Sequence, residues 1–225
     1  MTPTRRVAAA IDHAILRPDL TPHDVEASCA VAARFEVATV CCRPMDVVRC
    51  GRALARAGGR VGVITVIGFP HGAHTSAIKA AEATRALADG AIELDMVVPI
   101  GLVRAGDHAA VEADIAAVVA VADGHPVKVI LETGYLTDDE IAAACKTSEA
   151  AGAAFVKTST GYGPRNATIA DVRLMRASVS AHIGVKAAGG IRNIADALAL
   201  LDAGATRLGT SSTATILGGG EAEGY

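Results

Sequence analysis

The chain alternates short runs of β-branched and other apolar residues with longer alanine-rich stretches along nearly all of its 225 residues. This alternation predicts eight strands, at Ala10–Ile15, Thr39–Cys42, Gly62–Ile67, Ile92–Val98, Val127–Glu132, Ala154–Ser159, Ile183–Ala187 and Thr206–Ser211. It predicts helices between them, at about 22–35, 44–57, 76–89, 108–122, 138–151, 168–179 and 194–203. Alternating strands and helices imply a parallel sheet with right-handed crossovers. Eight such units in this length favour a closed barrel over an open sheet, so we expect a single-domain (β/α)8 TIM barrel.

Local signals support these boundaries. Thr21-Pro22 predicts an N-cap followed by proline at the first helical position, and Thr137 with Glu140 predicts a capping box. An approximate repeat also follows from three Gly-Ala pairs, each closing a helix and opening a strand, at residues 90–91, 152–153 and 204–205. Five residues after each glycine come Asp95, Lys157 and Gly209, which we expect at similar heights along their strands. We assign residues 1–217 to the barrel and residues 218–225 to a flexible C-terminal tail.

Charge and cysteine content exclude several classes of protein. A net charge of -3 points to neither a nucleic-acid partner nor an anionic membrane. The N-terminal apolar run is too short for a signal peptide, and the uncharged stretch 61–78 is interrupted by Gly68 and Pro70, so we expect no membrane segment. Five cysteines without a C-x-x-C pair argue against disulfides and a zinc site and for a cytoplasmic protein. We read His71 and His74 as loop residues and expect neither a metal nor a cofactor.

Charged residues fall on the strand faces expected to point inward. Because strand side chains alternate between faces, the barrel interior should hold three lysines and three carboxylates; these are Lys128, Lys157, Lys186, Glu93, Asp95 and Glu132. The chain has only five lysines against sixteen arginines. Since arginine cannot lose its proton at workable pH, strand positions that keep lysine are candidates for amine chemistry.

The position along each strand separates the three lysines. Lys128 and Glu93 come early, so we expect a structural ion pair. Lys157 and Lys186 come late, at the end where barrel active sites lie. A lysine titrates near 10.4, so nucleophilic attack near neutral pH requires its pKa to fall by about 3 units. Two ammoniums ~5 Å apart repel by roughly 3 kcal/mol at an effective dielectric of ~20, and desolvation can add the rest. A neutral Lys157 beside a charged Lys186 is therefore plausible, although spacing alone also allows the reverse, or lysines that merely pair with carboxylates.

Glycine-rich loops follow the last strands. Backbone N–H groups in such loops bind phosphate, and barrels commonly bind phosphate after strands seven and eight. The candidate residues are Gly189 and Gly190 after strand seven, Gly209, Ser211 and Ser212 after strand eight, and Gly161 after the Lys157 strand.

At these residues the sequence resembles the deoxyribose-phosphate aldolase family over nearly its whole length. The blocks that carry the resemblance include Ile11-Asp12-His13, Glu93-Leu94-Asp95-Met96-Val97, Phe155-Val156-Lys157-Thr158-Ser159-Thr160-Gly161 and Gly184-Val185-Lys186-Ala187-Ala188-Gly189-Gly190. The resemblance implies reversible cleavage of 2-deoxy-D-ribose 5-phosphate to acetaldehyde and D-glyceraldehyde 3-phosphate. It implies that Lys157 forms the imine, that Lys186 lowers the pKa of that amine, and that Asp95 assists proton transfer.

The resemblance also implies roles around the site. Asp12, Cys41 and Thr160 would line the substrate side, and Tyr225 would reach the site from a mobile tail. The partner expected is a small phosphosugar, with homodimers common in the family. Two positions depart from the family pattern: Ala14 replaces a frequent threonine, and Tyr162 replaces a lysine that some members place beside the phosphate.

Two rival functions stay open at this stage. One is another Schiff-base barrel aldolase, acting on a keto-sugar phosphate. The other is a catalytically silent barrel that binds sugar phosphate as a sensor, which Ala14 keeps in play.

Overall fold

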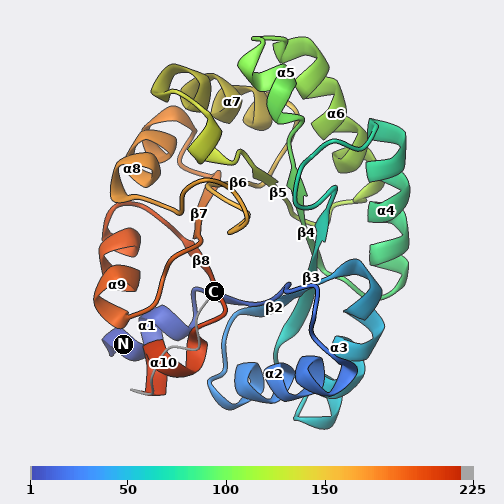
Figure 1. Cartoon of the computed structure of the whole chain (residues 1–225), viewed down its shortest axis with the longest axis vertical. Coiled ribbons are helices and arrows are strands. Elements are labelled where there is room, and N and C mark those ends of the chain that lie inside the picture. Colours follow the sequence, from blue (N-terminus) through green and yellow to red (C-terminus); the bar gives the residue numbers. More distant parts are fainter. Residues whose placement is uncertain (1, 219–225) are drawn as a thin grey trace.

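The computed structural model describes residues 2–218 and forms a closed barrel of eight parallel strands in the order β1 to β8. Figure 1 looks along the barrel, with the strands as an inner ring and the helices outside them. The strands are β1 (Ile11–Ile15), β2 (Thr39–Cys42), β3 (Gly62–Ile67), β4 (Glu93–Val97), β5 (Val127–Ile130), β6 (Phe155–Lys157), β7 (Gly184–Ala188) and β8 (Arg207–Thr210). The predicted (β/α)8 barrel and all eight predicted strands are confirmed, with several strands shorter than expected.

The seven predicted helices are all present, and each begins and ends within three residues of its expected bounds. They are α2 (Pro22–Arg34), α3 (Val47–Arg56), α4 (Ser76–Ala88), α6 (His108–Val121), α7 (Asp138–Ala150), α8 (Ile169–Ser178) and α9 (Ile194–Asp202). The predicted N-cap at Thr21 and the predicted capping box of Thr137 with Glu140 both form, and Thr21 also forms a capping box with Asp24, which was not predicted. Each satisfies backbone N–H groups that a helix start leaves without partners.

Short helical segments were not expected from the sequence. They are α1 (Pro3–Ala8), η1 (Pro44–Asp46), α5 (Ile100–Arg104), η2 (Thr133–Tyr135) and α10 (Thr213–Gly218). η1 occupies the first turn of the helix predicted at 44–57, so α3 begins only at Val47. No helix within residues 2–218 has the length and apolar character needed to cross a membrane.

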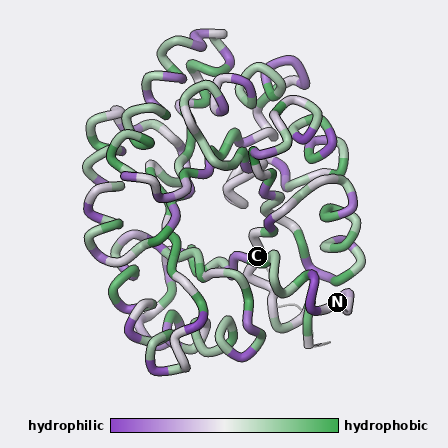
Figure 2. Tube along the Cα trace, turned by 180° about the vertical axis from the view of Figure 1, so that it is seen from behind, coloured by the Kyte–Doolittle hydropathy of each residue, from purple (hydrophilic) through white to green (hydrophobic). Residues whose placement is uncertain are grey.

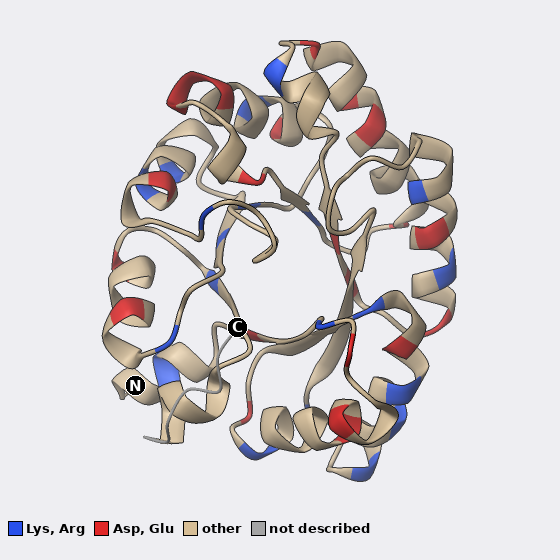
Figure 3. Ribbon diagram, in the orientation of Figure 1, with Lys and Arg blue, Asp and Glu red and all other residues tan. Residues whose placement is uncertain are grey.

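The larger apolar core lies between the barrel and its helices. It consists of the outward side chains of the strands packed against the inner faces of the helices. Figure 2 shows the opposite end of the molecule, with green hydrophobic stretches running through both layers. A smaller cluster of Leu16, Cys41, Ile64 and Val66 lies on the inner side of the barrel. The rest of the interior is markedly polar, and Figure 3 shows charged segments on the strands as well as on the outer helices.

Candidate active site

The two late lysines lie side by side at the barrel interior. The backbone register pairs Lys157 of β6 directly with Lys186 of β7. Their Nζ atoms each donate a hydrogen bond of 2.7 Å to the same atom, Oδ2 of Asp95 on β4. All three side chains are nearly or fully buried. The structure therefore brings together the three residues that the strand alternation had placed on one face.

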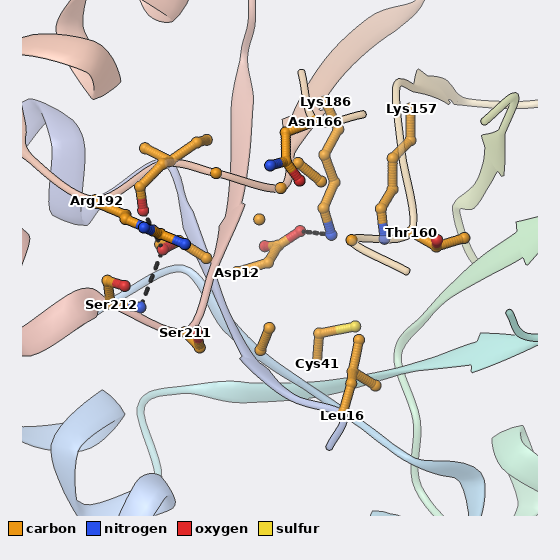
Figure 4. Close-up of a pocket in the computed structure, with 18 residues that line it drawn as sticks. Asp12, Leu16, Cys41, Lys157, Thr160, Asn166, Lys186, Arg192, Ser211 and Ser212 are labelled. Carbon is orange, nitrogen blue, oxygen red and sulfur yellow. Dashed lines mark hydrogen bonds and ion pairs between the residues drawn. The ribbon is translucent and has the colours of Figure 1, made fainter. Parts of the chain in front are cut away.

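Asp12 of β1 completes this cluster. Its Oδ2 lies 2.5 Å from the Lys186 amine, and its Oδ1 accepts hydrogen bonds from Arg207 of β8 and from Thr39. Figure 4 shows Asp12 facing Lys186, with Lys157 alongside. Only the family resemblance had pointed to Asp12, and Arg207 was not anticipated. Strand alternation contained a signal for Arg207, because it precedes the inward-facing Gly209 by two residues.

A second group of charges lies below the lysine pair. Lys128 of β5 contacts Glu93, as predicted, and its amine is also 3.1 Å from Asp95 Oδ1. Arg207 reaches Glu93 as well as Asp12. The Glu93–Lys128 pair is thus part of one network that extends to the lysines above.

These contacts form a closed ring of alternating charge within residues 2–218. Going around it, the order is Lys128, Glu93, Arg207, Asp12, Lys186, Asp95 and back to Lys128. The ring balances three cations with three carboxylates. Lys157 is the additional cation, and its only ion pair in this part of the chain is the one with Asp95.

The environment acts differently on the two lysine amines. Burial, together with the positive charge of Lys186, lowers the pKa of Lys157, although Asp95 opposes this shift. Burial acts in the same direction on Lys186, but the negative charges of Asp12 and Asp95 outweigh it and raise the pKa of that amine. For Asp95, burial opposes ionisation, yet the surrounding lysines hold its pKa well below the usual value. The arrangement thus favours a charged Lys186 next to an amine that gives up its proton more easily.

A cavity of about 180 Å³ opens onto this cluster. Its lining includes every described residue predicted for the site except Asp95, which is buried beneath the lysines; these lining residues are Asp12, Cys41, Lys157, Thr160, Gly161, Lys186, Gly189, Gly190, Gly209, Ser211 and Ser212. Ala14 also lines it. Tyr225 lies outside the described residues.

Glycines after β7 and on β8 form part of the cavity wall. Gly189 and Gly190 adopt left-handed φ angles of 89° and 74°, and a Cβ on Gly189 would come within 2.6 Å of the Asn166 side chain. A Cβ on Gly209 would lie 2.9 Å from Ala188 and 3.3 Å from the Lys186 side chain. Glycine therefore leaves room for the backbone to approach a ligand and for Lys186 to enter the cavity.

Sequence reasoning did not assign a role to two polar residues of this wall, Asn166 and Arg192, although Arg192 directly follows the Gly189–Ile191 loop. Asn166 lies on an irregular loop, where no periodic pattern marks its direction. Both side chains border the cavity in Figure 4.

One sequence expectation was wrong. Glu132 was placed in strand five facing the barrel lysines, but β5 ends at Ile130 and Glu132 has a left-handed φ of 55°. Its Oε2 accepts hydrogen bonds from the backbone N–H of Thr160 (3.1 Å) and from the Thr160 hydroxyl. The third interior carboxylate is Asp12 instead. Burial raises the pKa of Glu132, and the hydrogen bonds from Thr160 oppose the rise.

Tyr162, one of the two departures from the family pattern, lies on the loop after β6 and contacts residues that follow β1 and β3. Its hydroxyl donates to the Leu16 carbonyl oxygen at 3.0 Å, and its ring lies edge-on to Phe69 at 5.5 Å. A second cavity of about 300 Å³, bordered by Glu132, Arg104 and His71, lies on the β3–β6 side of this residue. Within residues 2–218, no cluster of three metal-binding side chains occurs, and His71 and His74 form no such site.

Known proteins share both this sequence and this architecture. A family model described as “DeoC/LacD family aldolase” matches residues 6–216. The deoxyribose-phosphate aldolase of Streptococcus pneumoniae is 48% identical over 214 residues, covering 95% of this chain and 96% of that protein. Deoxyribose-phosphate aldolase 1 of Bacillus licheniformis is 47% identical, covering 96% of each. A solved structure described as the unique tetrameric deoxyribose phosphate aldolase of Aeropyrum pernix superposes with a TM-score of 0.89 at 32% identity, covering 96% of this chain and 91% of that one.

Proposed function

The chain belongs to the DeoC/LacD aldolase family, and we propose that it cleaves 2-deoxy-D-ribose 5-phosphate reversibly to acetaldehyde and D-glyceraldehyde 3-phosphate. It is an aldolase, and therefore a carbon–carbon lyase. The observation that carries the chemistry is the sharing of Asp95 Oδ2 by Lys157 and Lys186. It supports a Schiff-base mechanism, in which a buried neutral amine acts as the nucleophile.

Lys157 is the nucleophile in this proposal. Its neutral amine adds to the C1 aldehyde of the open-chain sugar, and loss of water gives a protonated imine. Removal of the C3 hydroxyl proton then allows the C2–C3 bond to break, with its electron pair passing to the imine. Glyceraldehyde 3-phosphate leaves, and the remaining enamine takes a proton at C2. Hydrolysis of the imine releases acetaldehyde and restores the amine.

Asp95 and Lys186 serve proton transfer and charge control. Asp95 lies within hydrogen-bond reach of both amines, so it can pass protons between them and a water at the imine. Lys186 stays charged because Asp12 and Asp95 raise its pKa, and its charge helps keep Lys157 neutral. Cys41 and Thr160 border the carbon chain of the substrate, and Cys41 acts as a wall residue, since burial raises its pKa to about 11.

The phosphate occupies the glycine-rich end of the cavity. Gly161, Gly189, Gly190 and Gly209 offer close backbone approach, and Ser211 and Ser212 add polar groups. We add Arg192 as a cation at this end, where it can pair with the phosphate dianion. Tyr162 supplies no charge, so the phosphate relies on backbone groups, serines and Arg192.

Borohydride trapping tests the central claim. Acetaldehyde or deoxyribose 5-phosphate with borohydride should leave a reduced adduct on Lys157, located by peptide mass spectrometry, and Lys157→Leu should lose it. Lys146 is exposed and provides an internal control for unspecific amine modification. Absence of an adduct would defeat the imine mechanism and favour a silent phosphosugar-binding barrel. Cleavage of a keto-sugar phosphate without acetaldehyde release would favour the rival aldolase.

The setting of the protein is a further part of this proposal. We place it in the cytoplasm, as a homodimer or a larger homo-oligomer, without a nucleic-acid or membrane partner. The tetrameric Aeropyrum pernix relative supports self-association. Light scattering after size-exclusion chromatography measures the assembly, and a monomer at micromolar concentration would contradict this part alone.

A further inference from the structure

Glu132 lies just outside the cavity but is bonded to a residue that lines it. The Glu132 side chain is 1% exposed, and its Oε2 accepts two hydrogen bonds from Thr160. Thr160 borders the same cavity as Lys157, as Figure 4 shows. Glu132 is therefore linked to the proposed substrate site through its hydrogen bonds with Thr160.

The hydrogen bonds fix the direction of the Thr160 hydroxyl. A hydroxyl has one proton to donate and two lone pairs that accept. The Thr160 proton goes to Glu132, and one lone pair accepts the Tyr162 backbone N–H at 3.0 Å. Toward the cavity, Thr160 can then offer only the remaining lone pair. It is an acceptor for a ligand hydroxyl rather than a donor to it.

The backbone around Glu132 is shaped for this contact. A left-handed φ is uncommon for a residue with a side chain, and Glu132 has φ 55° and ψ 62°. Gly163 follows the Thr160 turn closely enough that a Cβ there would come 2.6 Å from Glu132 Oε1. The loops after β5 and β6 thus fit together around one buried carboxylate. Strained residues of this kind occur where surrounding structure holds a functional group in place.

We propose that Glu132 is a positioning residue that holds Thr160 as the acceptor for the C4 hydroxyl of the sugar phosphate. This inference rests on the proposed function. Along the chain, Thr160 comes between Lys157, which binds C1, and Gly161, which we assign to the phosphate site, and all three residues line the cavity. The C3 hydroxyl must give its proton to the base near the lysines, so C4 is the next hydroxyl toward the phosphate. After cleavage it is the C2 hydroxyl of glyceraldehyde 3-phosphate.

A pair of acceptor aldehydes tests the inference in the synthetic direction. With acetaldehyde as donor, kcat/KM is compared for D-glyceraldehyde 3-phosphate and for 3-hydroxypropanal phosphate, which lacks only that hydroxyl. We expect the wild type to prefer the first by roughly tenfold or more, the worth of one hydrogen bond. Thr160→Val and Glu132→Leu should both collapse the preference. Glu132→Gln should keep most of it, because the amide oxygen can accept the same two bonds.

Two glycine variants keep the test informative if Glu132→Leu does not fold. Gly163→Ala pushes on the Glu132 carboxylate and should lower the preference. Gly134→Ala is the control: its Cβ would lie 3.0 Å from Pro164 and from Arg165 rather than against Glu132, so it should leave the preference unchanged. If Glu132 only stabilised the fold, its variants would lower kcat/KM for both aldehydes by the same factor and leave their ratio unchanged.

An unchanged ratio in Glu132→Leu or Gly163→Ala, with product still formed, would overturn this inference alone. Failure of the wild type to form product with either aldehyde would overturn the proposed function and the inference with it.

Discussion

Removal of Lys186 should raise the pKa of Lys157. Both amines are 2.7 Å from Asp95 Oδ2, so they are at most twice that distance apart. At ~5 Å and an effective dielectric of ~20, two ammoniums repel by about 3 kcal/mol, which corresponds to about two pKa units. Burial is the larger cause of the lowered Lys157 pKa and persists in the variant. We therefore expect Lys186→Met to raise the pKa of Lys157 by up to about two units.

The pH dependence of kcat/KM for cleavage measures this shift. Its acid limb reports ionisation of the free enzyme, and Lys157 must be neutral to attack. A higher pKa moves that limb to higher pH, so activity near neutral pH falls while alkaline activity recovers part of the loss. Lys128→Met is the matched control: it removes another buried lysine that contacts Asp95, through Oδ1 and at 3.1 Å.

The control separates a local effect from general damage to the network. Lys128→Met should move the acid limb less, because Lys128 contacts the far oxygen of Asp95 and also pairs with Glu93. Thermal melting of both variants shows whether each is folded. An acid limb that stays in place in folded Lys186→Met, or that moves as far in Lys128→Met, would refute the assignment of Lys186 as the charge that depresses the Lys157 pKa.

Three further predictions concern the barrel and its loops. Gly184→Ala should destabilise the fold by about 1–3 kcal/mol in urea denaturation, because its Cβ would lie 2.1 Å from the Phe155 ring; full stability would show that the ring moves freely. Burial lowers the pKa of His13 to about 4. Between pH 6.5 and 4, His13 is therefore protonated in the unfolded chain but neutral in the folded chain. Stability should fall by up to about 3 kcal/mol from pH 6.5 to 4, and this loss, measured by denaturation at several pH values, should be absent in His13→Asn. Gly190→Ala, with φ 74° and a Cβ 2.9 Å from Asn166, should raise KM for deoxyribose 5-phosphate by roughly tenfold while sparing unphosphorylated deoxyribose; an equal effect on both sugars would argue against a phosphate loop.

Most of the fold could be predicted from the sequence because the spacing of apolar residues changes between strands and helices. Side chains that alternate in character every second residue mark the strands, and alanine-rich stretches with caps such as Thr21 and Thr137 mark the helices. The segments that escaped prediction, including α5 and α10, have five or six residues, which is less than two turns of helix. Their helical conformation depends on packing against the barrel, which no local pattern records. The same limit explains the early end of β5, where a left-handed residue interrupts an apparently continuous strand.

The candidate site was predictable to the extent that it lies on strands. Lys157, Lys186 and Asp95 follow from alternation, and the phosphate loops from their glycines. Asp12 entered only through the family resemblance, although its alternation with outward Ile11 and His13 gives the same direction. Arg207 carries the same kind of signal, because it lies two residues before Gly209 and therefore on the same face of β8. The position of Glu132 could not be predicted, since it depends on the contact between two irregular loops.

The closed ring of charges indicates which of the two lysines, Lys157 or Lys186, is the neutral amine, a question that the sequence spacing had left open. Within residues 2–218, each other cation of the network contacts two carboxylates: Lys186 contacts Asp12 and Asp95, and Lys128 and Arg207 each contact two likewise. Loss of a proton from Lys186 would open the ring and leave the buried carboxylate of Asp12 with Arg207 as its one remaining cationic partner among the described residues, which is costly in a buried setting. Loss of a proton from Lys157 leaves the ring balanced, with Asp95 still paired to Lys186 and Lys128. The neutral amine is therefore less costly at Lys157, the residue that points into the cavity without belonging to the ring.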